Sequence, residues 1–362
     1  MEILQNYLYW TRDPKDVSAL ASSSFNFSKA IPVIEADASY WIVKLDVQYG
    51  LRVVEKVKAK ELKELYELIS KNEGNFQSVF EYCYKNNKIE CVSILLQDER
   101  VDPAAGDNTA IKFASENGHL AIVDRLLQDD RVDPAAKNNY AIRIASENGH
   151  LAIVDRLLQD DRVDPAANNN TAIRVASAEG HLAVVERLLQ DKRVDPSANN
   201  DAIQLASWDG HLAIVERLLQ DDRVDPAAED NFAIRFASQN GHLAVVKILL
   251  QDDRVDPAAE DNFAIRFASQ NGHLDVVERL LQDKRVDPTA EDNYAIRFAS
   301  ERGHLAIVNR LLQDDRVDPT AKDNYAIRIA VENEHLAIVK RLLQDDRVTK
   351  KLSKTQLESY RR

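Results

Sequence analysis

The eight histidines of this 362-residue chain recur at an almost constant interval, and this regularity constrains the fold more than any other feature. Successive histidines lie 31 residues apart, with a single step of 30, and all but the last follow a glycine. They are His119, His150, His181, His211, His242, His273, His304 and His335. Repetition at a period of roughly 20 to 50 residues is typical of arrays in which each unit packs mainly against its neighbours. We therefore expect one long array with distinct ends.

The repeat unit Lys137–Pro165 has the pattern of two short amphipathic helices. In its first half, Asn139 is a candidate N-cap, apolar residues follow at helical spacing, and Gly149 is expected to end the helix because glycine tolerates a positive φ angle. In its second half, leucine and valine recur at three- and four-residue steps. The letters "DDRVDP" break this second helix, and Val163 offers an apolar side chain that pins the loop.

Two helices of about ten residues cannot bury both of their apolar stripes alone, but stacked copies can. A small residue recurs in the first helix, where it lets neighbouring helices approach to roughly 8–10 Å between their axes. These residues are Ala114, Ala145, Ala176, Ala206, Ala237, Ala268, Ala299 and Ala330. The sequence therefore predicts an all-α solenoid of helix-turn-helix units, about nine of them including the two ends.

In its details the repeat resembles the ankyrin repeat. The stretch "YAIRIAS" stands where that family has its Thr-Pro-Leu-His-x-Ala signature, and "ENGHLAIVDRLL" stands where it has a Gly-His turn and a second helix ending in Leu-Leu. The resemblance covers residues 75–348 and implies a solenoid that binds proteins along the concave surface of its first helices and hairpins. Alanine replaces the family's proline, and the Asp-x-x-Gly of the hairpin tip is missing, so we expect shortened fingers.

Residues 1–50 lie outside the repeat and resemble an F-box, the three-helix module that docks on the adaptor subunit of cullin-RING ubiquitin ligases. The matching pieces are "EILQNYL", the helix start "DPKD", "LAS" and "YWIVKLDVQYG", whereas the Leu-Pro pair that opens the family's motif is absent. By this resemblance, the adaptor-binding residues are Ile3, Leu4, Leu8, Pro14, Val17, Leu20 and Trp41. The alternative is a helical cap that only seals the array.

The rest of the chain divides by its pattern into four segments. They are a linking amphipathic helix at 51–73, an N-terminal capping repeat at 74–105, the ankyrin array at 106–348, and a C-terminal capping helix with a basic tail at 349–362. The letters "RVVEKVKAKELKELYELISK" predict that the linking helix spans most of its segment. Cys83 and Cys91 fall at packing positions of the capping repeat, and Ser353 begins a capping box in "SKTQLESY".

The charge of the array limits its partners. Residues 101–348 carry 29 basic and 44 acidic residues, a net charge of −15, so nucleic acid is not expected to bind. No apolar run approaches the roughly 18 residues of a membrane span, and the N-terminus has no signal-peptide pattern. A chain with two cysteines fits a reducing compartment, so we expect a cytoplasmic protein. We also expect a monomer without membrane partners.

The histidines do not predict a metal site. Zinc requires three or four ligands within about 2.0–2.3 Å of one ion, whereas equivalent residues of stacked repeats lie roughly 10 Å apart. We expect each imidazole to hydrogen-bond the backbone of the neighbouring loop instead. Because the chain also lacks a glycine-rich phosphate loop and a pocketed pair of carboxylates, we expect no cofactor and no enzymatic activity.

A row of basic residues follows the first helices. Its members are Lys112, Arg143, Arg174, Arg235, Arg266, Arg297 and Arg328. In four repeats a glutamate stands four residues later, which favours a solvated row of ion pairs, and the alternative is a groove for acidic peptides. Gln204 interrupts the row, and Trp208 takes the glutamate position of that repeat. The indole is expected either to anchor a partner or to lie flat on its own array.

Aromatic residues form a second row at the start of four consecutive first helices, and we expect packing between repeats rather than an exposed ladder. The candidate partner-binding residues are Gln204, Trp208, Arg235, Arg266, Arg297, Phe232, Phe263, Tyr294 and Tyr325. By resemblance, a protein with both an F-box and ankyrin repeats is a substrate receptor of a ubiquitin ligase, a combination familiar from large DNA viruses, in which case the host cytoplasm is its location. The alternative is a scaffold or competitive inhibitor without a link to ubiquitin.

Overall fold

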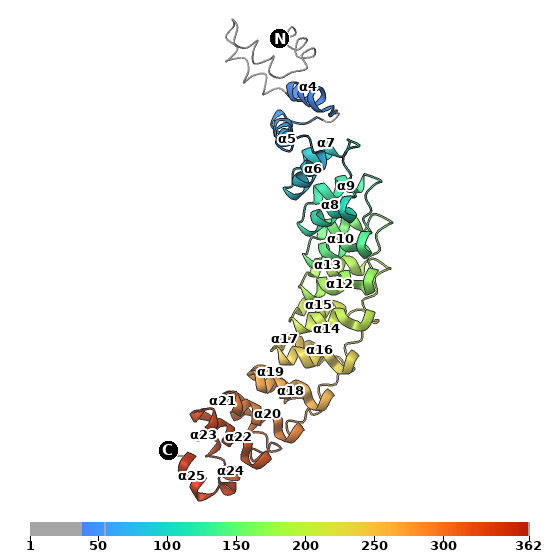
Figure 1. Ribbon diagram of the computed structural model, residues 1–362. Helices are drawn as coiled ribbons and strands as arrows, with labels where there is room; N and C mark the ends of the chain where they lie inside the picture. Colours follow the sequence, from blue (N-terminus) through green and yellow to red (C-terminus); the bar gives the residue numbers. More distant parts are fainter. Residues whose placement is uncertain (1–37, 54–55, 361–362) are drawn as a thin grey trace. The chain divides into compact units, whose positions relative to one another are not determined.

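The computed structural model describes residues 38–53 and 56–360, and the secondary structure of these residues is helical, without a strand. The chain divides into two compact units, residues 1–164 and 165–362. In each unit the helices follow one another as pairs (Figure 1), which is the arrangement that the repeat pattern predicts. None of the helices in the described ranges is long and apolar enough to cross a membrane.

Within the residues that the structure describes, the first unit consists of two leading helices and the helix pairs of three repeats. Its helices are α4 (Ala38–Tyr49), α5 (Ala59–Lys71), α6 (Phe76–Lys85), α7 (Ile89–Leu95), α8 (Ala105–Glu116), α9 (Leu120–Leu127), α10 (Ala136–Glu147) and α11 (Leu151–Leu157). We call the first helix of each pair helix A and the second helix B.

The second unit holds the helix pairs of six repeats and two closing helices. Its helices are α12 (Ala167–Ala178), α13 (Leu182–Leu189), the short 3-10 helix η1 (Ala198–Asn200), α14 (Asp201–Trp208), α15 (Leu212–Leu218), α16 (Ala228–Gln239), α17 (Leu243–Leu249), α18 (Ala259–Asn271), α19 (Leu274–Leu280), α20 (Ala290–Glu301), α21 (Leu305–Leu311), α22 (Ala321–Glu332), α23 (Leu336–Leu342), α24 (Asp346–Lys351) and α25 (Lys354–Tyr360). Helices α14, α16, α18, α20 and α22 pack against one another in sequence, and so do α15, α17, α19, α21 and α23 (Figure 1).

The core consists of the apolar positions that the repeat pattern marks. Ile142 and Ala145 of helix A and Val154 of helix B are fully buried, as is Val163 of the loop. The alanine of this position is fully buried in every repeat from α8–α9 to α22–α23, where neighbouring helices A pack closely. Burial of these stripes by adjacent repeats is what makes each short helix stable.

Three residues near the start of helix A form a left-handed turn instead of the predicted side-chain cap. Glu260, Asp261 and Asn262 have φ angles of 51°, 53° and 60°, a conformation that asparagine and aspartate tolerate better than most residues. The Oδ1 atom of Asn262 accepts the backbone N–H of Asp287 in the next loop at 2.7 Å. We call this contact the asparagine clamp. Asn139 makes the same contact with Asp164, so this asparagine joins two loops rather than capping its own helix.

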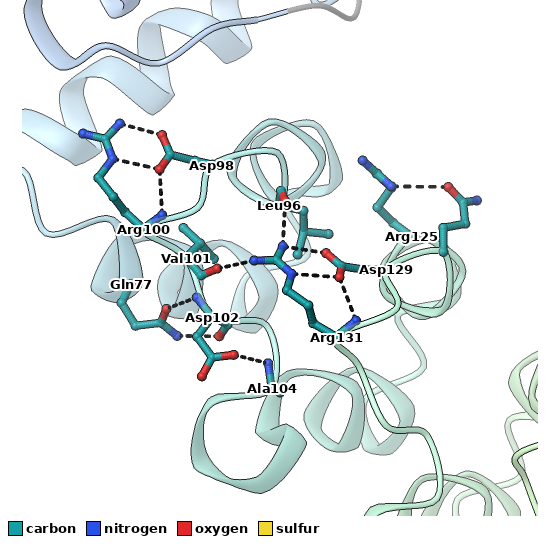
Figure 2. Close-up of polar contacts among 11 residues, drawn as sticks. Gln77, Leu96, Asp98, Arg100, Val101, Asp102, Ala104, Arg125, Asp129 and Arg131 are labelled. Atoms are coloured by element: carbon teal, nitrogen blue, oxygen red, sulfur yellow. Dashed lines mark hydrogen bonds and ion pairs between the residues drawn. The ribbon is translucent and has the colours of Figure 1, made fainter.

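A second contact between repeats comes from the arginine of "DDRVDP". The Nη1 atom of Arg131 donates to the carbonyl of Val101 at 2.8 Å, while its guanidinium also pairs with Asp129 (Figure 2). Arg285 repeats this arrangement in the second unit, where its Nη1 atom donates to the carbonyl of Val255 at 2.7 Å. The arginine thereby ties its own loop to the preceding one, and the sequence analysis did not anticipate this contact.

The histidine after the turn supplies a third contact in most repeats, as predicted, although among the described residues no such hydrogen bond is found for His273. The bond to a backbone carbonyl is present at His119, His150, His211, His242, His304 and His335. The Nε2 atom of His304 lies 3.0 Å from the carbonyl oxygen of Gln270 in the preceding repeat and therefore donates to it. Gly272 makes room for this imidazole, because a Cβ atom there would lie 2.7 Å from His304 Cε1, and its φ angle of +89° also disfavours any other residue. The Gly-His step thus joins a helix end to the next repeat.

The linking helix α5 begins at Ala59, later than its amphipathic pattern predicts. Lys58, directly before it, has extended backbone angles of φ −72° and ψ 149°. The preceding stretch is rich in valine, whose branched Cβ favours extended backbone. Within α5, Leu62, Leu65 and Ile69 are buried, and the helix packs against α6 and α7. Helix α5 therefore covers the apolar end of the first repeat.

The capping repeat α6–α7 differs from the others in its polar contacts. Gln77 replaces the clamp asparagine, accepting the N–H of Asp102 at 2.9 Å and donating to its carbonyl at 3.1 Å (Figure 2). Cys83 and Cys91 are buried free thiols, which confirms their packing positions. A hydrogen bond with Cys91, together with burial, raises the pKa of the Cys83 thiol.

The second unit ends with the predicted capping box. The N–H of Ser353 donates to Gln356 Oε1 at 2.9 Å, and the N–H of Gln356 donates to Ser353 Oγ at 3.2 Å. The reciprocal pair of Ser353 and Gln356 starts α25 at the position that the sequence indicates.

Earlier in this unit, Glu334 takes the place of the turn glycine, with a φ angle of +61°.

Candidate protein-binding surface

The helix A face of the second unit carries a continuous row of aromatic side chains, which we call the aromatic ladder. Its members are Trp208, Phe232, Phe236, Phe263, Phe267, Tyr294, Phe298 and Tyr325. Within one repeat the rings of Phe263 and Phe267 stack with 4.0 Å between their centroids, and the ring of Tyr294 in the next repeat lies 5.7 Å from Phe267. All members except Trp208 are half-buried, so the rings pack between repeats while part of each stays exposed.

Only one ring of each ladder step is among the residues predicted from the sequence. Phe232 and Phe263 were predicted, whereas Phe236 and Phe267, which stand four residues later on the same helices A, were not. Residues at this spacing are neighbours on a helix surface, so the repeated "FAIRF" contained the signal for a pair of rings. The position was overlooked because aliphatic residues such as Ile144 occupy it in other repeats.

Arginines of the basic row lie alongside the rings. The Nη2 atom of Arg266 donates to the carbonyl of Glu260 in the left-handed turn at 2.9 Å. Its guanidinium carbon lies 5.6 Å from the centroid of Phe267 and 5.2 Å from that of Tyr294, within the range of cation–π attraction. Arg235 and Arg297 make equivalent contacts in their repeats. The turn and the rings therefore hold these side chains in fixed positions.

Arg297 does not form the ion pair that was predicted between an arginine of the basic row and the glutamate four residues later. Its guanidinium donates to two backbone carbonyls of the turn. Glu301 instead accepts the hydroxyl of Tyr325 at 2.9 Å, and Gln270 accepts the hydroxyl of Tyr294 at 2.6 Å. Burial raises the pKa of both tyrosines, so their hydroxyls stay protonated and donate. The turn carbonyls lie within reach of the arginines because the turn is left-handed.

Trp208 begins the ladder and is its most exposed member. The indole is 38% exposed and stacks on Phe236 of the next repeat, with 4.7 Å between centroids and 26° between planes. The backbone carbonyl of Trp208 accepts from His242 at 2.8 Å, so the residue is fixed on both its main chain and its side chain. The indole therefore lies on the array and also presents one large apolar surface to solvent.

Gln204 does not belong to the exposed surface. Its side chain is only 6% exposed, and within the part of the chain that the structure describes its Nε2 atom has no hydrogen-bond partner. The amide is too short to reach the turn carbonyl that the longer arginines use. In the preceding repeat, Arg174 forms an ion pair with Asp201 at 2.7 Å. The arginines that accompany the ladder are thus confined to the repeats that follow Trp208.

Most of the predicted adaptor-binding residues lie outside the described residues. These are Ile3, Leu4, Leu8, Pro14, Val17 and Leu20. Trp41 is described, and it is 3% exposed in α4, with its ring centroid 5.6 Å from that of Tyr66 in α5. The indole is thus part of the core between α4 and α5, and the prediction that Trp41 contacts an adaptor stays a prediction.

The described residues do not contain a group of three or more histidine, cysteine, aspartate or glutamate side chains that could hold a metal ion. His150, His242 and His304, for example, each lie beside a different backbone carbonyl.

Comparison with known families identifies the repeats. The profile of three consecutive ankyrin repeats matches residues 131–200, 203–292 and 265–354, and the profile of a single ankyrin repeat matches residues 106–139. A search of the curated proteins found no match. The matched residues cover more than half of the chain, and they include the whole aromatic ladder. Because ankyrin repeats are protein interaction modules, a role in binding other proteins is supported. The chain belongs to the ankyrin repeat family.

Proposed function

We propose that this protein binds a partner protein on the helix A face of its second unit, along the aromatic ladder, and has no catalytic activity of its own. The observation that carries the proposal is the ladder itself, a row of half-exposed rings ending in an indole that is 38% exposed. Tryptophan, tyrosine and arginine dominate the binding energy of protein interfaces. The two aromatic residues bury a large area with few rotatable bonds, and arginine forms several charge-assisted hydrogen bonds.

The local structure supports this proposal in a second way. The rings of the ladder are stacked, and Arg266 is fixed by both a turn carbonyl and two rings. Side chains that are already ordered lose little entropy on binding, so more of the contact energy appears as affinity. The left-handed turns also replace the long hairpin fingers of the family, which leaves the ladder as the main feature of this face.

A photo-crosslinking experiment tests the proposed face. The crosslinker p-benzoylphenylalanine is placed at Trp208 in one variant and at Ala244, an exposed residue of helix B in α17, in the other. We expect covalent adducts with cellular proteins from the ladder position and not from the helix B position. We also expect Trp208→Ala to weaken capture of the adduct-forming protein at least roughly tenfold, as for a binding hot spot. Adducts from Ala244 alone would show that the wrong face has been chosen.

A second candidate function is that of a substrate receptor of a cullin-RING ubiquitin ligase. It rests on the likeness of residues 1–50 to an F-box. The test is co-purification of the full chain with the cullin adaptor, which deletion of residues 1–50 should abolish while ladder binding remains. If the deletion instead leaves adaptor binding unchanged, or if the purified full chain and adaptor do not associate, the segment is a cap that seals α6 and α7.

A further inference from the structure

The three arginines of the ladder keep part of their hydrogen-bonding capacity unused. In Arg235, Arg266 and Arg297 the Nη2 atom donates to a carbonyl of the left-handed turn at 2.9 Å. Each guanidinium also contacts rings of two successive repeats. Among the described residues, no acceptor is found for the Nη1 atom of any of the three. An arginine held in this way presents a positive charge and a free donor without further ordering.

On the helix A face of the second unit, the arginines without a carboxylate partner are confined to a defined stretch. On the N-terminal side, Arg174 is neutralised by Asp201 at 2.7 Å, and Gln204 takes the next position without a charge. Within the second unit, the first arginine of the row without a carboxylate partner is therefore Arg235, one repeat after Trp208. Arg297 follows two repeats later, and the exposed Arg328 ends the row. A partner that uses this row meets three to four positive charges in a line.

The spacing of the row matches one backbone conformation of a peptide. Packed helices lie roughly 8–10 Å apart, so successive arginines are displaced by about this distance. A polyproline II helix rises about 3.1 Å per residue with three residues per turn, so every third side chain recurs after roughly 9 Å on the same side. An extended segment with an acidic residue at every third position thus places one carboxylate near each guanidinium.

The residues between the charges favour the same ligand. Aromatic grooves bind polyproline II segments because proline rings pack on flat aromatic surfaces. The ladder supplies such surfaces between successive arginines, with Phe263 and Phe267 closely stacked in one repeat. The exposed carboxylates of Glu229, Glu260 and Glu291 flank the row at the turns, so a uniformly acidic peptide is repelled. The surface therefore favours a peptide with acidic residues at a fixed interval over a peptide in which every residue is acidic.

We propose that the partner segment bound along the aromatic ladder is an extended, proline-rich peptide with an acidic side chain at every third position. This inference rests on the proposed function, since it specifies the partner of the same face. Its carboxylates pair with Arg235, Arg266 and Arg297, its prolines pack on the rings between them, and one end of the segment reaches Trp208.

Fluorescence anisotropy with labelled peptides tests the inference on the full chain. The probe has four Glu-Pro-Pro units. The controls are four Gln-Pro-Pro units, four Glu-Pro-Pro-Pro units and a peptide of glutamates alone. We expect the probe to bind at least roughly tenfold more tightly than each control at about 0.1 M salt, because charge pairs and spacing must both match. Equal binding of the Glu-Pro-Pro and Glu-Pro-Pro-Pro peptides would overturn the fixed interval.

Two variants with the same change in charge locate the binding site. Arg266→Gln should weaken binding of the Glu-Pro-Pro peptide roughly fivefold, which is the upper end for a partly exposed ion pair. Arg279→Gln on helix B should leave the affinity for this peptide unchanged. Thermal unfolding by circular dichroism checks that both variants are folded. Equal losses in the two variants would mean that only the overall charge acts. If Trp208 crosslinks to a cellular protein while no Glu-Pro-Pro peptide binds, the proposed function stands and the inferred peptide is wrong.

Discussion

Replacing the two rings of one ladder step tests whether ring stacking stabilises the array. Phe263 and Phe267 stack with 4.0 Å between centroids and 25° between planes. Because Phe263→Leu and Phe267→Leu each keep an apolar side chain of similar size, we expect each to lower the free energy of unfolding by about 1–1.5 kcal/mol. A close aromatic pair contributes about 0.5–1.5 kcal/mol beyond its buried area, and either single variant already removes that pair. The double variant should therefore cost about 1 kcal/mol less than the sum of the two.

Urea unfolding of the full chain, followed by far-ultraviolet circular dichroism and by tryptophan fluorescence, measures these energies. The two signals must coincide, since an array can unfold in parts and the cycle requires one transition. The control cycle combines Phe263→Leu with Phe298→Leu, whose ring is separated from Phe263 by two other rings of the ladder. We expect the control pair to be additive within about 0.5 kcal/mol. A coupling below about 0.3 kcal/mol for the stacked pair would refute the stabilising role of stacking.

Further predictions concern the contacts between repeats and the capping box. Gly272→Ala should lower the melting temperature more than Gly50→Ala, because both residues have a positive φ angle but only the first is packed against an imidazole. Arg285→Met should cost about 1–2 kcal/mol in urea unfolding, since it removes a hydrogen bond to the preceding repeat and the partner of Asp283. A hydrogen bond from Arg285 lowers the pKa of the Asp283 carboxyl. Its folded-state pKa therefore lies below its unfolded value of about 3.8, so its stabilisation is present above that pH and is lost as the pH falls further. The melting temperature should drop below about pH 4, and less in Arg285→Met than in the wild type. Ser353→Ala should reduce the helicity of α25, at a cost of about 1 kcal/mol, as monitored by hydrogen exchange.

The sequence predicts the helix pairs and their core because these depend on a period that it repeats many times. The buried alanine at Ala145, the loop valine at Val163 and the histidine contact of His304 all follow from a local pattern and its copies. The capping box at Ser353 is equally local, since its two partners lie three residues apart. Each of these features needs only residues that are close in sequence or at equivalent positions in the next repeat.

The contacts between loops could not be predicted from the sequence, because the same residues also fit familiar roles within their own helix. An asparagine before a helix fits the role of an N-cap, whereas Asn139 contacts a loop 25 residues later. An arginine four residues before a glutamate fits an ion pair, whereas Arg297 follows a left-handed turn whose carbonyls lie closer. Three consecutive positive φ angles cannot be inferred from residues such as Glu260, which rarely adopts them alone. The arrangement becomes clear only when the next repeat is in place.

The contacts between repeats also bear on how such a chain changes its length over time. Several junctions of the second unit use the same contacts between the same atoms. Examples are the arginine contacts of Arg254 and Arg285, the asparagine contacts of Asn262 and Asn293, and the histidine contacts of His304 and His335. A repeat that is duplicated or lost there therefore leaves two repeats with matching contact residues next to each other. Residues 218–243 and 249–274 are identical, which is the trace expected of a recent duplication. Each copy gained in this way lengthens the row of rings by one step. The length of the aromatic ladder thus changes by one repeat at a time. Recombination between identical stretches is enough for such a change, and no residue of the existing surface has to be substituted.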